Sequence, residues 1–210
     1  MGRLVIVRHS ESEWNALGKW TGTTNVHLSP KGRREAELMG VVLRDFSFDQ
    51  AYVSEQVRTT ETLQAILKAS PNPRVLITTT AALNERDYGV YTGKNKWQVK
   101  EEIGEAAFQK LRRSWDYSVP GGETIKDVYE RVEPYYLSTV LPLLMAGESI
   151  LIVAHGNSIR ALLKYLENIS DADISLVEMI FGTALIYKVD ASGHMVTKVV
   201  RTIDSPAPPA

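Results

Sequence analysis

The sequence predicts an α/β fold, a three-layer sandwich in which helices flank a mainly parallel central sheet. Two aliphatic runs of strand length, at residues 4–7 and 150–154, contain no polar residue, as is typical of strands buried on both faces. Helical segments separate these runs from further strand-like runs, and strands that alternate with helices build parallel sheets. No linker or repeat divides the chain, so we expect one domain over residues 1–203 and a disordered tail at 204–210.

The first half of the chain starts with the strand at 4–7, which is followed by a polar loop at 14–27. Ser29 and Pro30 then mark the start of a helix, because serine is a favoured N-cap and proline a favoured first helical residue. Short apolar runs and helical spacing predict, in order, a strand at 51–54, a helix that begins near residue 58, and a strand at 75–78.

The second half begins with residues 84–119, which we expect to be irregular and then helical, before a long helix from about 124 to 145. Pro134 and Pro142 should kink or interrupt that helix, since proline lacks a backbone donor. The second aliphatic strand and another helix come next. Two late strands, near 184–189 and 195–201, flank the sequence DASG and predict a hairpin.

The composition is that of an ordinary globular chain of 210 residues, 44% hydrophobic, with a formal net charge of -1. This balance argues against nucleic acid or an anionic membrane as the main partner. The sequence has no cysteine, which excludes disulfides, and its four histidines show no metal-ligand spacing, so we expect no metal. The apolar runs are too short to span a membrane and no secretory signal precedes the first strand, which predicts a cytoplasmic protein.

Both aliphatic strands end on a histidine. Arg8 and His9 follow the first strand, and His155 follows the second, just before a helix. In open α/β sheets, ligands bind at the carboxyl ends of the strands, and a helix N-terminus there favours an anion. The pair suggests one imidazole as a nucleophile and the other as its partner, whereas the alternative is that these residues are polar ends of strands.

This pattern suits phosphoryl transfer. A neutral imidazole can attack a phosphoryl group, and fixed positive charges must then stabilise the phosphoryl oxygens. Arg8 and Arg58 are candidates for that task, although a lone arginine such as Arg58 can equally be a solvated surface residue. Glu85 is the candidate that protonates the leaving oxygen, with an ion pair to Arg86 as the alternative explanation of its presence.

Residues 4–15, LVIVRHSESEWN, resemble the signature of the histidine phosphatase superfamily, and more narrowly that of cofactor-dependent phosphoglycerate mutases. The match continues in order along nearly the whole chain. It includes WTG at 20–22, LSPKG at 28–32, LNER at 83–86, GKNK at 93–96, RRS at 112–114 and AHGNSIR at 154–160. The combination of LNER, RRS and AHGNS is specific to the mutase branch, because simple phosphatases of the superfamily usually keep only two histidines, two arginines and a carboxylate.

The resemblance implies a role for each matching residue. It implies that His9 becomes phosphorylated, that Arg8, Arg58 and His155 hold the phosphoryl group, and that Glu85 donates and accepts protons. The implied phosphate pocket contains Ser10, Ser12, Asn15, Thr21, Gly22, Gly156 and Asn157. The residues implied to hold the substrate's carboxylate and second phosphate are Tyr88, Lys96, Arg112 and Arg113, although two adjacent arginines can also be a solvated helix face.

The implied activity is the interconversion of 3-phosphoglycerate and 2-phosphoglycerate in glycolysis and gluconeogenesis, through a phosphohistidine primed by 2,3-bisphosphoglycerate. The implied ligands are small phosphorylated three-carbon acids. One alternative is a phosphomonoester phosphatase that uses the same phosphohistidine with water as the acceptor. Another is a non-catalytic protein that binds phosphorylated ligands, which the presence of His9, His155 and Glu85 opposes.

Four positions depart from the usual mutase pattern. Ser10 stands where glycine usually follows the histidine, Thr23 stands where tryptophan is common, and the segment FGTA at 181–184 replaces Thr-Gly-Ile/Val-Pro. The connection between Ser114 and Glu123 is also short, whereas typical members carry a sizeable insertion there. We therefore expect a monomer or dimer rather than a tetramer, and a looser cover that raises hydrolysis.

Overall fold

The computed structural model describes residues 1–71 and 74–204 and contains one six-stranded sheet in the order β3-β2-β4-β1-β5-β6. The strands are β1 (Gly2–Arg8), β2 (Gln50–Val53), β3 (Leu76–Thr79), β4 (Ser149–Ala154), β5 (Thr183–Val189) and β6 (Met195–Thr202). The first four strands run parallel to one another, and β5 and β6 form an antiparallel hairpin at one edge. The predictions of a mainly parallel sheet and a late hairpin are confirmed, while the tail predicted at 204–210 lies outside the described residues from 205 onward.

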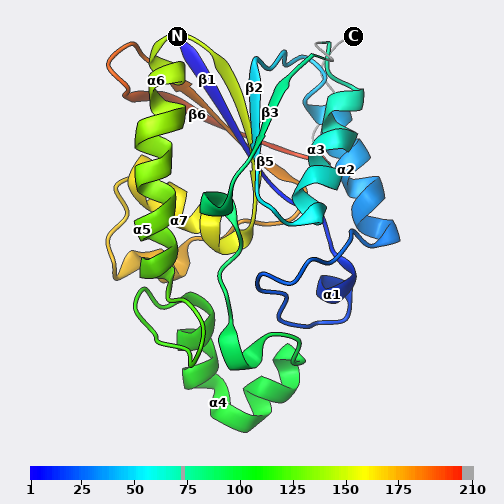
Figure 1. Cartoon of the computed structure of the whole chain (residues 1–210), viewed down its shortest axis with the longest axis vertical. Helices are drawn as coiled ribbons and strands as arrows, with labels where there is room; N and C mark the ends of the chain where they lie inside the picture. The colour runs from blue at the N-terminus through cyan, green and yellow to red at the C-terminus, as the bar shows by residue number, and fades with distance from the viewer. Residues whose placement is uncertain (72–73, 205–210) are drawn as a thin grey trace.

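Helices cover both faces of this sheet (Figure 1). Helices α2 (Pro30–Val42) and α3 (Val57–Lys68) lie on one face, and α5 (Ile125–Tyr135), α6 (Leu141–Met145) and α7 (Gly156–Leu166) lie on the other. Strand β1 shows why its aliphatic run has no polar position. Leu4 and Ile6 belong to the core under α5 and α7, and Val5 and Val7 belong to the core under α2 and α3.

One sequence expectation needs correction, and the expected interruption of the long helix near its prolines is confirmed. The predicted loop at 14–27 is preceded and partly replaced by a short helix, α1 (Glu13–Ala16), because Ser12 and Asn15 form a reciprocal capping box. The long helix predicted from 124 to 145 keeps going past Pro134, but the segment η3 (Tyr136–Val140) is π-helical and α6 follows it. The missing proline donor therefore shifts the hydrogen-bond pattern, and Pro142 sits in the first turn of α6, where no donor is needed.

A small second core lies over the carboxyl ends of the parallel strands, at the lower end of the molecule in Figure 1. Helix α4 (Lys96–Arg113) supplies Val99, Phe108 and Leu111 to it, and Trp20 and Tyr88 pack against them from loops. Short 3-10 turns connect the elements around it: η1 (Ala81–Leu83), η2 (Gly89–Tyr91) and η4 (Asp173–Leu176). The second core covers the edge of the sheet from which the predicted site residues extend.

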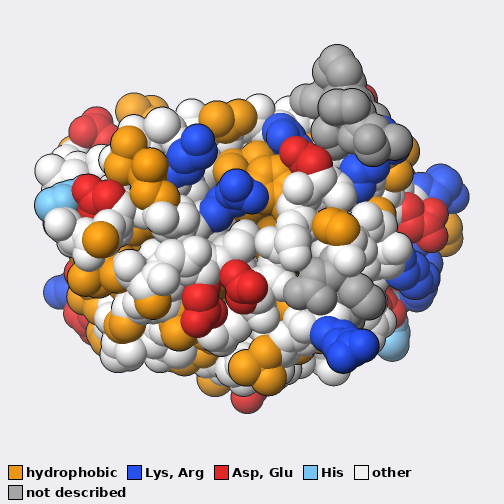
Figure 2. Space-filling model, turned by 90° about the horizontal axis from the view of Figure 1, so that it is seen from above, with side chains coloured by type: hydrophobic (Ala, Val, Ile, Leu, Met, Phe, Trp, Pro, Cys, Tyr) orange, Lys and Arg blue, Asp and Glu red, His pale blue; other side chains and the backbone are white. Residues whose placement is uncertain are grey.

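The opposite end of the molecule shows acidic and basic side chains interspersed with apolar ones (Figure 2). Within residues 1–71 and 74–204, none of the helices combines the length and the apolar character that crossing a bilayer requires.

Candidate active site

Strands β1 and β4 place His9 and His155 side by side. Arg8 and Ala154, the last residues of the two strands, are partners in the parallel ladder, so the histidines that follow them leave the sheet at the same point. Their ring centroids are 4.9 Å apart, and both side chains are buried. The strand register alone therefore joins two residues that are separated by most of the chain.

The imidazole of His9 has a defined orientation. Its Nδ1 lies 2.7 Å from the carbonyl oxygen of Ser10, which can only accept a hydrogen bond. Nδ1 therefore carries the proton, and the lone pair is on Nε2. Burial lowers the pKa of His9 well below its usual value, and the nearby charges of Arg58 and Arg8 lower it further. The neutral imidazole, which is the nucleophilic form, is thus the resting form at neutral pH.

His155 is held through a third strand. Its Nε2 lies 2.7 Å from the hydroxyl of Ser54, the residue that follows β2. His155 is also the N-cap of α7, so the N-terminus of an eleven-residue helix points its backbone donors toward the same region. Burial lowers the pKa of His155 well below its usual value, with Arg58 as the next cause. Its Nδ1 is buried and has no hydrogen-bond partner within the described part of the chain.

Two arginines bring positive charge beside the histidines. Arg58 is fully buried and donates to the carbonyl oxygens of Thr24, at 2.8 Å, and Gly22, at 3.0 Å, so it is not a solvated surface residue. Burial lowers the pKa of Arg58 to about 10, which leaves it charged at neutral pH. Arg8 donates to the carbonyl oxygen of Met179 at 2.7 Å, and its guanidinium lies 3.8 Å from the ring centroid of Phe181.

Glu85 is held by backbone groups rather than by Arg86. Its Oε1 accepts from the N–H of Arg86 at 2.8 Å and from the N–H of Asn157 at 3.2 Å. The Arg86 guanidinium instead donates to the carbonyl oxygens of Leu111, Tyr117 and Glu123, in three separate segments. Both contacts of Glu85 use one oxygen, so Oε2 keeps its capacity to move a proton in the adjoining cavity.

Two adjoining cavities connect these groups. The inner cavity, of about 50 Å³, is lined by Arg8, His9, Asn15, Trp20, Thr21, Gly22, Arg58, Glu85, Tyr88 and Lys96. The outer cavity, of about 100 Å³, is lined by Arg8, Trp20, Glu85, Tyr88, Lys96, Arg112, Arg113, Gly156, Asn157 and Arg160. The two sets share five residues, so one hollow leads from His9 to the basic end of α4.

Three of the predicted site residues, Ser10, Ser12 and His155, line neither cavity. Ser10 acts through its backbone, since its carbonyl oxygen orients His9 and its N–H donates to the hydroxyl of Thr62. The N–H and hydroxyl of Ser12 both donate to Oδ1 of Asn15, a residue that does line the inner cavity.

Several buried polar groups near His9 have no hydrogen-bond partner among the described residues. They are Nε of Arg8, Nε of Arg58, the hydroxyl of Thr21 and Nδ1 of His155. A buried polar group without a partner costs about 1–3 kcal/mol, so a cluster of such groups indicates a ligand. Because most of these groups are donors and two of them are cationic, the ligand that would satisfy them is an anion.

The outer cavity contains a linked set of polar side chains. Nδ2 of Asn157 donates to the Tyr88 hydroxyl at 2.7 Å, and Arg160 donates to Oδ1 of the same amide. Burial, followed by the charges of Arg8 and Arg112, lowers the pKa of Lys96 to about 8. The ammonium therefore titrates near physiological pH.

The two adjacent arginines at the end of α4 differ in their contacts. The Arg112 guanidinium lies 5.5 Å from the ring centroid of Phe108, and Arg113 pairs with Glu178 and donates to the carbonyl oxygen of Ser175. Both side chains face the outer cavity.

Several residues at this site were not predicted from the sequence. Ser54 had a usable signal, because it ends an aliphatic strand in the same way as His9 and His155 do. Arg160 had one as well, since it lies one helical turn beyond Gly156. Glu178 and Phe181 had none, because they belong to an irregular loop whose position depends on the whole fold.

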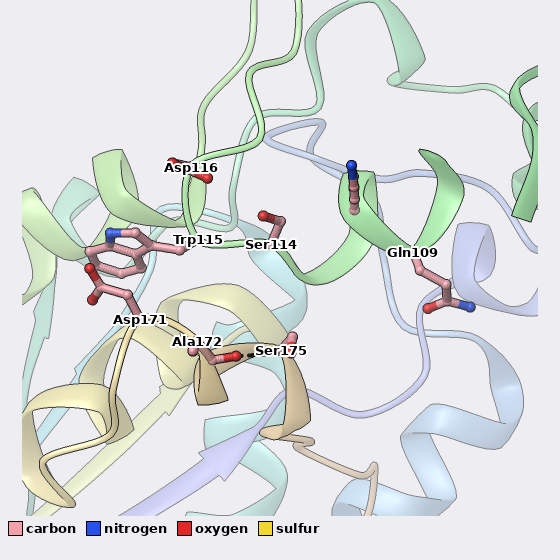
Figure 3. A pocket seen from close by; sticks show the side chains of 8 residues that line it. Gln109, Ser114, Trp115, Asp116, Asp171, Ala172 and Ser175 are labelled. Atoms are coloured by element: carbon pink, nitrogen blue, oxygen red, sulfur yellow. Dashed lines mark hydrogen bonds between the residues drawn. The ribbon is translucent and has the colours of Figure 1, made fainter. Parts of the chain in front are cut away.

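A larger cavity of about 500 Å³ lies apart from the histidines, between the segments 109–116 and 171–175. Figure 3 shows Trp115 and Asp171 close together on one side of it and Gln109 on the other. Its lining mixes acidic, basic and neutral side chains, in contrast to the donor-rich hollow beside His9. Among residues 1–71 and 74–204, no group of three or more His, Cys, Asp or Glu side chains is arranged to hold a metal ion.

Comparisons with known proteins place the chain in a family. Residues 4–203 match the family model described as histidine phosphatase superfamily (branch 1). The chain is 44% identical over 185 residues to a protein of Cytophaga hutchinsonii named 2,3-bisphosphoglycerate-dependent phosphoglycerate mutase, which covers 88% of this chain and 86% of that protein. It is 42% identical over 197 residues to the phosphoglycerate mutase of Schizosaccharomyces pombe, which covers 93% of each.

Solved structures show the same fold. YhfR of Bacillus stearothermophilus superposes with a TM-score of 0.81 at 24% identity, over 93% of this chain and 94% of that one. A mycobacterial glucosyl-3-phosphoglycerate phosphatase superposes with a TM-score of 0.81 at 21% identity, over 94% of this chain and 96% of that one.

Proposed function

The chain belongs to the histidine phosphatase superfamily, and we propose that it is a phosphoglycerate mutase that interconverts 3-phosphoglycerate and 2-phosphoglycerate. One observation carries this proposal beyond the family membership. The hollow beside the buried histidines continues into a second space bordered by Lys96, Arg112, Arg113 and Arg160. A phosphatase needs to bind only one phosphoryl group, whereas a mutase must also hold the substrate's carboxylate and its second phosphoryl group.

In this mechanism, His9 forms and breaks one bond to phosphorus. Nε2 of phosphorylated His9 releases its phosphoryl group to the free hydroxyl oxygen of the substrate, while Oε2 of Glu85 takes the hydroxyl proton. Nε2 then attacks the other phosphorus, the bond from that phosphorus to the substrate oxygen breaks, and Glu85 returns its proton to this oxygen. Arg8, Arg58 and the helix N-terminus after His155 stabilise the charge on the phosphoryl oxygens in both steps.

The unpaired donors around His9 fit 2,3-bisphosphoglycerate as the primer of this cycle. Arg8, Arg58, Thr21 and His155 would hold its transferring phosphoryl group, and the cations of the outer cavity would hold the rest of the molecule. When bound, the bisphosphate supplies the phosphoryl group that first loads His9.

The proposal extends to the setting of the enzyme. A single domain over residues 1–203, in a cytoplasmic monomer or dimer, is supported by a family match over residues 4–203 and by the short connection after Ser114. The absence of cysteine is compatible with a reducing compartment.

A coupled assay on 3-phosphoglycerate tests the function. Formation of 2-phosphoglycerate is followed with and without catalytic 2,3-bisphosphoglycerate, and free phosphate is measured in the same tube. We expect isomerisation that depends on the bisphosphate and little release of phosphate. Release of phosphate without isomerisation would instead identify a phosphomonoester phosphatase that uses water as the acceptor.

A further inference from the structure

A third cavity, of about 260 Å³, adjoins the outer one and faces solvent. Its cations are Arg8, Arg112, Arg113 and Arg160, and its one carboxylate is that of Glu178. These four arginines also line the outer cavity, so the carboxylate faces the same cationic cluster that the proposed function assigns to the substrate.

Glu178 is paired with one member of this cluster. Oε1 of Glu178 accepts from Nη2 of Arg113, in a pair whose glutamate side chain is 51% exposed and whose arginine side chain is 25% exposed. An ion pair with this exposure contributes little to stability, so an anionic ligand can displace the carboxylate. A phosphate group is a strong competitor, because it carries more charge and binds arginine through two oxygens.

Arg113 has a second, longer contact besides the one with Glu178. Its Nη1 lies 3.5 Å from the carbonyl oxygen of Ser175, in η4, and its Nε is buried without a hydrogen-bond partner in the described residues. The guanidinium therefore keeps a contact with the main body of the protein when the charge of Glu178 is removed. This arrangement favours competition by Glu178 over a role in orienting Arg113.

We propose that Glu178 is a specificity-determining residue that competes with the outer anionic group of the substrate for Arg113. The inference rests on the proposed function, because it takes the basic outer cavity as the place where that group binds. Glu178 repels a ligand in proportion to the charge that the ligand brings to the outer cavity. It therefore weakens the binding of acids that carry two anionic groups more than the binding of inorganic phosphate, which needs only the inner cavity.

Calorimetric titration of the unphosphorylated protein tests this proposal, with 3-phosphoglycerate and inorganic phosphate as the two probes. The variant is Glu178→Gln, which removes the charge and keeps the shape. We expect it to bind 3-phosphoglycerate about fivefold more tightly, which is the upper range for an exposed charge pair, and to change the dissociation constant for phosphate much less. The half-activating concentration of 2,3-bisphosphoglycerate in the mutase assay should fall by at least the same factor.

The matched control is Glu130→Gln. Glu130 is an exposed residue of α5 that pairs with Lys126, and it lines none of the three cavities, so this variant changes the net charge equally without touching the site. A second experiment introduces Glu178→Gln into an Arg113→Ala variant. The gain in affinity for 3-phosphoglycerate should nearly disappear there, because the cation for which Glu178 and the substrate compete is absent.

Three results would overturn the proposal: weaker or unchanged binding of 3-phosphoglycerate by Glu178→Gln, an equal gain for phosphate, or the same gain in the Glu130→Gln control. A full gain in the Arg113→Ala background would also contradict it. The mutase assay is a separate readout. If no isomerisation occurs while Glu178→Gln still tightens 3-phosphoglycerate, the proposed function fails and the competition at Arg113 stands.

Discussion

Nδ1 of His9 lies 2.7 Å from the carbonyl oxygen of Ser10, the residue that replaces the glycine common at this position in mutases. The contact uses the Ser10 backbone, which any residue can supply. It leaves Nε2 with the lone pair and prevents the ring from turning that nitrogen away from the inner cavity. The replacement of glycine is therefore compatible with a phosphorylated His9.

Replacement of this nucleophile should remove the chemistry. We expect His9→Ala to lower the rate of isomerisation by at least about a thousandfold, because His9 lines the inner cavity and His155 does not. Incubation with labelled 2,3-bisphosphoglycerate should label the wild-type protein through an acid-labile bond and leave the variant unlabelled. His194→Ala, at an exposed histidine of the late hairpin, is the control and should keep the label. A His9→Ala protein with measurable mutase turnover would contradict the mechanism.

Phe181 should support the rate of transfer through Arg8. Its ring lies 3.8 Å from the Arg8 guanidinium and 5.9 Å from the His9 ring, so it contacts the cation that stands beside the nucleophile. Arg8 and Phe181 are half-buried, and a cation–π contact at such a site is worth about 1 kcal/mol, so we expect Phe181→Leu to lower kcat by about fivefold with a smaller change in KM. Phe181→Tyr should retain most activity. The control is Leu176→Ala, on an exposed side chain of the same segment, and an equal loss in this control would count against the role of the ring.

Lys96 should set the alkaline limit of substrate binding. Burial lowers its pKa to about 8, and only the protonated ammonium attracts an anion, so affinity is lost as the pH rises through that value. We expect KM for 3-phosphoglycerate to rise above about pH 8. In Lys96→Arg this rise in KM should begin at a higher pH, because arginine stays charged. A bound anion raises the pKa of the ammonium. The alkaline decline should therefore occur at higher pH in the profile of kcat than in the profile of kcat/KM. If KM rises at the same pH in Lys96→Arg as in the wild type, a group other than Lys96 is responsible for the rise.

The two histidines should make stability fall in mild acid. Burial lowers the pKa of both below the ordinary 6.5, so below about pH 6.5 the unfolded chain binds protons that the folded one does not. The stability contribution is fully present above that pH and declines below it, by roughly 1 kcal/mol per pH unit for each histidine. The free energy of unfolding, measured with urea at several pH values, should depend less steeply on pH in His9→Asn and His155→Asn than in the wild type. His194→Ala should keep the wild-type dependence on pH. Identical slopes in all four proteins would show that the histidines do not carry the effect.

Much of the site can be predicted from the sequence, because its two histidines directly follow buried strands. An aliphatic run predicts a buried strand, parallel strands present their carboxyl ends at one edge, and His9 and His155 must then emerge together. The same reasoning applies to Ser54, which follows β2, although no role for it was predicted. The roles implied for Lys96, Arg112 and Arg113 came from the family resemblance, since a basic helix end by itself indicates only a solvated surface.

The partners of charged side chains depended on the tertiary structure. Sequence proximity favoured an ion pair between Glu85 and Arg86, yet Arg86 joins three carbonyl oxygens from distant segments and Glu85 accepts from backbone N–H groups. Glu178 reaches Arg113, and Phe181 reaches Arg8, from a loop with no repeating pattern. The sequence by itself determined the elements and the strand-end histidines, because hydrophobic periodicity is a local property. Only the packed structure decided which charges meet, because those contacts depend on where many elements come to rest together.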